Sequence, residues 1–141
     1  MCRTWRCASS SSLRSTASSS SLPPTASALA ARVAELFSAL RAPVIVTDPA
    51  SAETIKYAAN AFLATKISFV NAIAAVCEAV GADMNDVVLG MGYDKRIGHD
   101  FLRPGPGYGG SCFPKDTSAL VRIAEDAGYD FGLLRSAMAV N

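Results

Sequence analysis

A helical pattern from Ser51 to Val80 constrains the fold of this chain more than any other stretch. Ser51 can cap its start, Glu53 falls in its first turn, and Gly81 suits its C-terminal end. A helix of about 30 residues spans about 45 Å. Its apolar residues are Ile55, Ala58, Ala59, Phe62, Leu63, Ile67, Val70, Ile73, Ala74, Cys77 and Val80. Because they cover more than the one stripe that a small domain buries, we predict a homodimer in which residues 51–80 of two copies pack together.

The other expected elements are shorter, and most are helical. Apolar residues recur at helical spacing before the long helix, Asp83 can cap the element that follows it, and Pro114 suits a first helical turn. A β-branched run between prolines is typical of a short edge strand. Helices are expected over 28–40, 84–91, 114–127 and 131–141, and the strand over 43–47. The predicted fold class is mostly α, organised on one long helix, with a short N-terminal strand.

A glycine-rich stretch with a cysteine is the main functional candidate. Glycines at 105, 107, 109 and 110 leave backbone amides open to a ligand, and Cys112 follows them. The expected helix from Pro114 places Cys112 at a helix start, where amide dipoles favour a thiolate. Asp116 lies one turn further on the same face. This layout is typical of an active site, but free cysteines are also commonly buried and inert, so a glycine-rich turn beside a core cysteine is the alternative.

The same glycines also match the pattern of a dinucleotide-binding loop. Gly105, Gly107 and Gly110 fit G-x-G-x-x-G, with acidic residues at 125 and 126 about twenty residues later. That pattern requires a preceding apolar strand, whereas residues 94–104 read as a polar loop. The acidic pair also lies inside the following helix. The match therefore does not predict a dinucleotide site.

Composition and charge exclude several functions. The formal net charge of +1 argues against nucleic-acid binding by a basic surface. Cysteines at 2, 7, 77 and 112 fit neither a zinc site nor a short disulfide framework, so we expect a reducing compartment, the cytoplasm. No uninterrupted apolar run approaches the ~18 residues that span a membrane, and no membrane association is expected. His99 has no evident metal or nucleophile partner and is expected at the surface, and no metal site is predicted.

The N-terminal segment differs in kind from the rest. Residues 1–34 contain four arginines and no acid, whereas the remainder has nine Lys and Arg against twelve Asp and Glu. Residues 1–27 are rich in serine and are expected to be disordered, because they cannot bury a core. Arginine and serine without acids resemble an organellar transit peptide. A flexible tail, or a segment read from a misplaced start codon, explains the same composition.

Two polar residues interrupt the long helix at one-turn spacing. Lys56 and Asn60 are four residues apart and share a face. Taken alone, they are an ordinary solvated pair. Lys66 and Asn71 are five apart and share a face less well.

Three motifs together resemble the UDP-glucose/GDP-mannose dehydrogenase family, most closely its UDP-glucose 6-dehydrogenase branch. They are residues 52–64 (AETIKYAANAFLA), 94–98 (DKRIG) and 107–116 (GYGGSCFPKD). The resemblance implies that residues 49–141 are the family's central helical dimerisation domain, similar to the C-terminal domain of 6-phosphogluconate dehydrogenase. Residues 28–48 would be the last helix and strand of a Rossmann domain that is otherwise missing. NAD is the implied cofactor, bound by that absent domain, and the C-terminal nucleotide-sugar domain is missing too.

The resemblance also implies a reaction and a set of roles. The family oxidises the primary alcohol of a nucleotide sugar such as UDP-glucose to a carboxylate, using two NAD. Cys112 would trap the aldehyde as a thiohemiacetal, Lys56 and Asn60 would hold the oxyanion, and Asp116 would position or activate water. The residues implied to contact the nucleotide sugar are Arg96, across the dimer interface, with Phe101, Arg103, Gly105, Gly107, Tyr108 and Gly109.

Three functions remain open at this point. The chain is the catalytic centre of a nucleotide-sugar dehydrogenase that is inactive without its other domains, or a stand-alone helical dimerisation module without catalysis. A third possibility is a nucleotide-sugar binding module, which needs no reactive Cys112. A Rossmann fingerprint encoded immediately upstream would separate the first from the second.

Overall fold

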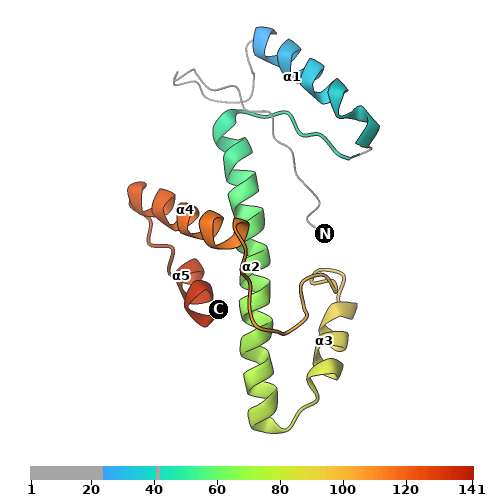
Figure 1. The fold of residues 1–141 in the computed structure, drawn as a ribbon, viewed down its shortest axis with the longest axis vertical. Coiled ribbons are helices and arrows are strands. Elements are labelled where there is room, and N and C mark those ends of the chain that lie inside the picture. Colours follow the sequence, from blue (N-terminus) through green and yellow to red (C-terminus); the bar gives the residue numbers. More distant parts are fainter. Residues whose placement is uncertain (1–23, 41) are drawn as a thin grey trace. The chain divides into compact units, whose positions relative to one another are not determined.

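The structure, a computed structural model, describes residues 24–40 and 42–141, with side chains from residue 28 onward. In order, its elements are α1 (Pro24–Leu36), the 3-10 helix η1 (Ser38–Leu40), α2 (Pro49–Val80), α3 (Met84–Tyr93), α4 (Cys112–Asp126) and α5 (Gly132–Val140). The mostly helical fold class, organised on one long helix, is confirmed (Figure 1). The chain divides between residues 56 and 57 into two compact units.

The first unit contains α1, η1 and the start of α2. Helix α1 begins four residues before the expected start, at Pro24, which a first helical turn tolerates. The strand predicted over 43–47 is wrong. Residues 42–48 form no regular element, and Val44, Ile45 and Val46 are exposed. A strand needs a neighbour for its N–H and C=O groups, and no strand occurs in the described residues to supply one. The expectations for residues 1–23 lie outside the described part of the chain.

The long helix α2 is confirmed, but its start differs from the prediction. Pro49 is its first residue, and the Asp48 carboxylate accepts a hydrogen bond from the Ser51 amide at 2.9 Å. Asp48 therefore caps the helix, and not Ser51 as predicted. Hydrogen bonding from Ser51 lowers the pKa of the Asp48 carboxyl group. At the other end, Gly81 has φ +73°, the left-handed conformation that ends many helices.

Length and composition alone would allow α2 to cross a membrane, contrary to the expectation from uninterrupted apolar runs. The few polar residues of α2 interrupt every apolar run. They are too few to lower its mean hydropathy much, so the helix is strongly apolar on average without containing a long unbroken run. A core helix of a soluble protein meets the same criterion. In the second unit α2 packs against α4 and α5, but only 22% of its most apolar window is buried within the described residues.

The second unit, residues 57–141, is built around the part of α2 that it contains. Figure 1 shows α3 on one side of the helix and α4 with α5 on the other. Helix α3 starts as predicted, because the Asp83 side chain accepts hydrogen bonds from the amides of residues 85 and 86. The core cluster joins α2, α4 and α5, and Ser68 Oγ donates a buried hydrogen bond to the Ala137 carbonyl at 2.6 Å. The members of the cluster are Ala61, Val121 and Leu134, with Leu120, Phe131 and Met138 packed against them.

A long loop, residues 94–111, joins α3 to α4 and crosses α2 (Figure 1). Two side chains of α2 hold it. Lys66 Nζ donates to the Ile97 carbonyl at 3.0 Å, and Asn71 Oδ1 accepts from the Gly105 amide at 2.9 Å. Leu102 lies between Ile97 and Gly105 in the sequence. Its side chain is buried and anchors the middle of the loop. The glycine stretch is therefore fixed against the long helix before α4 begins.

Candidate active site

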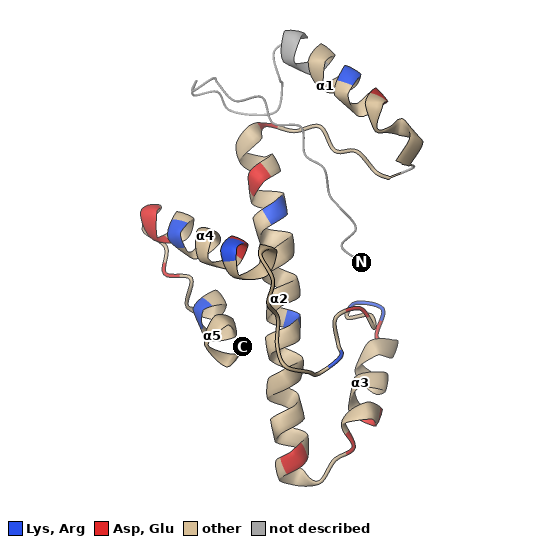
Figure 2. Ribbon diagram, viewed as in Figure 1, with Lys and Arg blue, Asp and Glu red and all other residues tan. Residues whose placement is uncertain are grey.

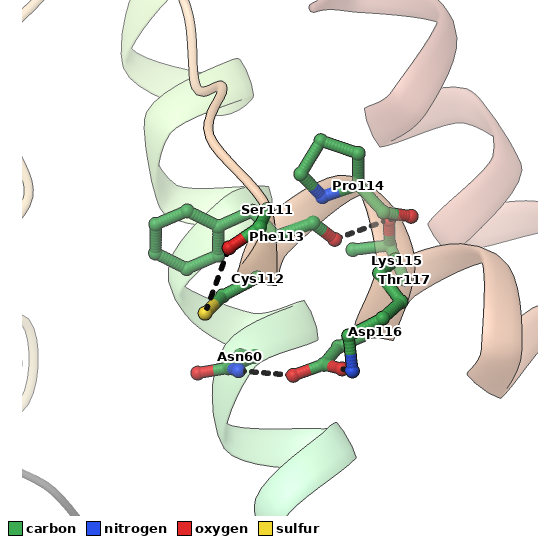
Figure 3. Close-up of polar contacts among 8 residues, drawn as sticks. All are labelled: Asn60, Ser111, Cys112, Phe113, Pro114, Lys115, Asp116 and Thr117. Atoms are coloured by element: carbon green, nitrogen blue, oxygen red, sulfur yellow. Dashed lines mark hydrogen bonds and ion pairs between the residues drawn. The ribbon is translucent and has the colours of Figure 1, made fainter.

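Cys112 is the first residue of α4, in agreement with the position that Pro114 predicted. Its thiol is free and exposed, and the Ser111 hydroxyl lies 3.8 Å from its sulfur (Figure 3). Ser111 occupies the cap position without using its side chain to cap the helix. The amides of the first turn therefore stay open next to the sulfur, an arrangement that favours a negative charge there.

Asp116 lies one turn into α4 and is fully buried. Its Oδ2 accepts a hydrogen bond from Asn60 Nδ2 at 2.6 Å, and its Oδ1 accepts one from Lys115 Nζ at 2.7 Å. The hydrogen bond and charge of Asp116 raise the pKa of Lys115 above its usual value. Asn60 comes from α2, so this carboxylate joins two helices that are 56 residues apart in sequence. In Figure 3 the Cys112 thiol and the Asp116 carboxylate are directed to the same side of α4, beside Asn60.

Three aromatic rings stand next to the cysteine. Phe113 packs edge-on against Phe101, with ring centres 6.4 Å apart, and against Tyr108 at 5.7 Å. Phe101 has φ +63° and is the one non-glycine residue in this conformation among those described. A bulky residue is strained there, and such strain is concentrated at functional sites. The rings form an apolar wall beside Cys112.

A second asparagine, Asn141, also holds the glycine loop in shape. Asn141 accepts a hydrogen bond from the Tyr108 amide at 2.7 Å and donates one to the Tyr108 carbonyl at 3.1 Å. Gly107 has φ +95°, and a Cβ placed on it would lie 2.7 Å from Asn141 Oδ1. Both the conformation and the close approach therefore require glycine at this position.

Several predicted site residues lie apart from this cluster. In the turn after α3, the Arg96 guanidinium donates three hydrogen bonds to the Asp94 carboxylate and the Arg96 amide donates a fourth, which lowers the pKa of Asp94. The Arg96 side chain is 89% exposed. Arg103 is exposed and makes no hydrogen bond or ion pair within the described residues. Lys56 is exposed on α2, four residues before Asn60. His99 is exposed, as expected, and its ring meets Tyr93 edge-on.

The sequence did not predict the residues that support the site. Lys115 stands in one of the three motifs, and its position directly before Asp116 was a usable signal. Asn71 interrupts an apolar helical pattern, which was the only sign that it holds the loop, whereas Asn141 follows α5 and showed no such sign. Lys66, judged to be poorly aligned with Asn71, binds the same loop at a different point.

Fold and site together define a helical domain built on one long helix. Asn60 of this helix donates a hydrogen bond to the buried Asp116 carboxylate, which lies one turn after Cys112 at the start of α4. The thiol at this helix start is exposed, so a ligand can reach it. A sequence model of the UDP-glucose/GDP-mannose dehydrogenase family, central domain, matches residues 50–141. The chain belongs to this family.

Individual relatives give the same assignment. The chain is 62% identical over 107 residues to the UDP-glucose 6-dehydrogenase YwqF of Bacillus subtilis, a match that covers 76% of this chain and 24% of the relative. It is 59% identical over 112 residues to the UDP-glucose 6-dehydrogenase TuaD of the same organism, covering 79% and 24%. The solved structure of a UDP-glucose dehydrogenase from Pyrobaculum islandicum superposes with a TM-score of 0.77 at 40% identity, over 82% of this chain and 27% of that one. The chain therefore spans about a quarter of the length of the relatives it matches.

Proposed function

We propose that this chain supplies the central, cysteine-bearing domain of an NAD-dependent enzyme that oxidises UDP-glucose to UDP-glucuronate. The observation that carries the proposal is the turn from Cys112 to Asp116, in which an exposed thiol at a helix start lies one turn before a buried carboxylate held by Asn60. The high identity to two UDP-glucose 6-dehydrogenases favours UDP-glucose over other nucleotide sugars.

Cys112 acts as the nucleophile in this proposal. Its thiolate adds to the aldehyde carbon of the half-oxidised sugar, forming the C–S bond of a thiohemiacetal while the carbonyl oxygen becomes an oxyanion. Loss of hydride from that carbon gives a thioester, and water then displaces the thiolate to release the carboxylate. Exposure of Cys112 makes this addition possible, whereas a buried sulfur such as Cys77 could not reach a substrate.

The polar groups around Cys112 serve the oxygen atoms of the reaction. Asn60 donates to the oxyanion the amide hydrogen that it does not donate to Asp116, and Lys56, one turn earlier on α2, contributes positive charge. Asp116 orients Asn60 and the water that hydrolyses the thioester. Its complete burial and short hydrogen bonds suit a group that must keep one orientation through several steps.

The nucleotide sugar lies along the loop that precedes α4. Phe101 and Arg103 flank it, while open backbone amides from Gly105 to Gly109 contact its oxygens, and the strained backbone at Phe101 supports this location. Arg96 reaches the substrate of the partner subunit in a homodimer, which its 89% exposed side chain permits. The homodimer forms through α2, because Phe62, Phe69 and Val76 recur every seven residues and remain exposed.

NAD would supply the hydride acceptor for both oxidations. The described residues of this chain do not fit a dinucleotide site. The matching glycine pattern, Gly105 to Gly110, lies in a loop whose backbone is held by two asparagines, and no strand precedes it in the described residues. NAD would therefore be bound by residues outside this chain, in a cytoplasmic enzyme without a nucleic-acid or membrane partner.

A domain graft tests the proposal. Residues 42–141 are placed between the N-terminal and C-terminal domains of a UDP-glucose 6-dehydrogenase relative, and NADH absorbance is followed with UDP-glucose and NAD. The graft should turn over, and Cys112→Ser in the graft should abolish NADH production. An inactive graft that still forms a folded dimer would favour the alternative function, a stand-alone dimerisation module.

A further inference from the structure

The first turn of α4 must accommodate two negative charges in the proposed function. Cys112 needs to carry a thiolate, and Asp116 lies four residues later on the same face. Like charges at this spacing disfavour one another, and the full burial of Asp116 adds a preference for its neutral form. Some group must offset this for both to be ionised near neutral pH.

Asn60 cannot be that group, because its amide brings a hydrogen bond but no charge. Lys115 can, since its ammonium lies 2.7 Å from Asp116 Oδ1, whereas Asn60 binds the other carboxylate oxygen, Oδ2. Its side chain remains 66% exposed, so it reaches the buried carboxylate from the solvent side without being part of the core. Figure 3 shows the lysine and the asparagine meeting the carboxylate of Asp116, with Cys112 one turn away.

We propose that Lys115 is a positioning residue that neutralises the buried Asp116 and thereby allows Cys112 to ionise. This inference rests on the proposed function for its biological meaning, because only a nucleophilic Cys112 makes use of the effect. The pKa of Lys115 is raised first by its hydrogen bond to Asp116 and then by the charge of that carboxylate, with smaller contributions from Tyr57 and Cys112. The ammonium therefore stays charged over the whole range in which a cysteine titrates.

Two tyrosines also lie near this turn. Tyr57 comes from α2, directly after Lys56, and Tyr108 comes from the loop, where its ring packs on Phe113. Lys56, Tyr57 and Tyr108 are left unchanged in every variant, so changes at 115 and 116 report on the pair itself.

The test measures how the alkylation rate of Cys112 depends on pH in the full 141-residue chain. Iodoacetamide is applied in short pulses across a pH series, and mass spectrometry of the peptide containing residue 112 gives the midpoint of the rate increase. Lys115→Gln should move this midpoint upward by about one unit, or about tenfold in rate at a pH below both midpoints. Lys115→Arg should keep the midpoint of the unmodified chain, because it retains the charge.

Two further variants separate charge from structure. Lys115→Gln combined with Asp116→Asn should return the midpoint to near its original value, because the carboxylate that opposed the thiolate is gone. Asp116→Asn alone should lower the midpoint, since Lys115 is then uncompensated. At high pH all variants should reach the same maximal rate, because the thiolate is then fully formed in each of them. Circular dichroism of each variant checks separately that it is folded.

Two results would overturn the proposal: an unmoved midpoint in Lys115→Gln, or an equal shift in the single and double variants. If Lys115→Gln does not fold, Asp116→Asn decides, and a midpoint that stays or rises rejects the inference. Neither measurement needs NAD or UDP-glucose. An active domain graft with unmoved midpoints would reject this inference alone, whereas an inactive graft with the expected shifts would reject only the proposed function.

Discussion

The two cysteines of the described residues illustrate how position determines chemistry. Cys77 is 5% exposed within α2, whereas Cys112 is exposed at the first position of α4. Exposure and a helix start both favour reaction at Cys112. The two thiols are otherwise chemically the same, so the folded structure alone separates them.

We predict that Cys112 is alkylated several-fold faster than Cys77 below neutral pH. Peptide mapping after a short treatment with iodoacetamide measures both rates in one sample. In urea the two rates should converge, because unfolding removes both the burial of Cys77 and the helix start at Cys112. Equal rates in the folded chain, or faster reaction at Cys77, would contradict the active-site assignment of Cys112.

A second residue-scale prediction concerns the clamp on the glycine loop. Asn141→Ala removes both hydrogen bonds to Tyr108, and one such bond contributes about 1 kcal/mol, or about a fivefold change in local opening. Hydrogen exchange of the Tyr108 amide should accelerate by at least that factor, as followed by NMR. Asn85→Ala, on the exposed surface of α3, is the matched control and should leave this amide unchanged.

At the scale of elements, the packing of α4 and α5 on α2 positions the site. The ends of these helices follow from local chemistry: Asp83 caps α3, Gly81 ends α2, and Gly128, with φ +78°, follows α4. Their arrangement depends on a small core in which Leu134 is 2% exposed. Because Asn60 and Asp116 belong to different helices, loosening this core would also separate them.

Leu134→Ala should therefore lower the free energy of unfolding by about 2–5 kcal/mol, since it deletes a buried side chain from the contact between three helices. The neighbouring Leu133 is 71% exposed, and Leu133→Ala should change stability by no more than about 0.5 kcal/mol. Urea unfolding followed by circular dichroism, at one protein concentration, measures both. Similar losses for the two variants would show that α5 does not pack as described.

At the scale of the whole molecule, α2 presents an apolar surface that one subunit leaves uncovered. Between residues 57 and 80 it carries only Lys66 and Glu78 as charged residues, as Figure 2 shows. Phe62 is 66% exposed and Phe69 is 51% exposed on this helix. Apolar side chains of this size in a regular stripe are typical of a helix–helix contact between subunits.

We predict a dimer of the chain at micromolar concentration, measured by sedimentation. Replacing both phenylalanines, Phe62→Glu with Phe69→Glu, should give a monomer, because it places charges in the contact. Ser118→Glu, exposed on α4, adds a charge elsewhere and should leave the dimer intact. A monomeric parent chain with a cooperative melt would rule out the predicted interface.

A final prediction concerns activity of the isolated chain. It should produce no measurable NADH from UDP-glucose, because hydride transfer needs a nicotinamide held against the reacting carbon. The graft described above is the positive control under the same assay conditions. Turnover by the isolated chain would mean that its residues bind NAD. It would contradict the interpretation that the Gly105–Gly110 loop is not a dinucleotide site.

Features that depend on near neighbours in the chain could be predicted from the sequence. Helical periodicity, the Asp83 cap, the glycine at 81 and the three motifs predicted a mostly helical domain of this family, with Cys112 at a helix start. These succeed because periodicity and capping act within one or two turns. The predicted strand failed for the opposite reason, since a strand depends on a partner elsewhere in the chain.

Only the tertiary structure revealed how the site is held together. The contact of Asn60 with Asp116 joins residues 56 apart, and the clamp of Asn141 on Tyr108 joins residues 33 apart. Neither spacing leaves a periodic trace in the sequence. The pairing of Lys115 with Asp116 also depends on how α4 packs, because this packing buries the Asp116 carboxylate. A buried charge affects the ionisation of its neighbours more strongly than a solvated one does.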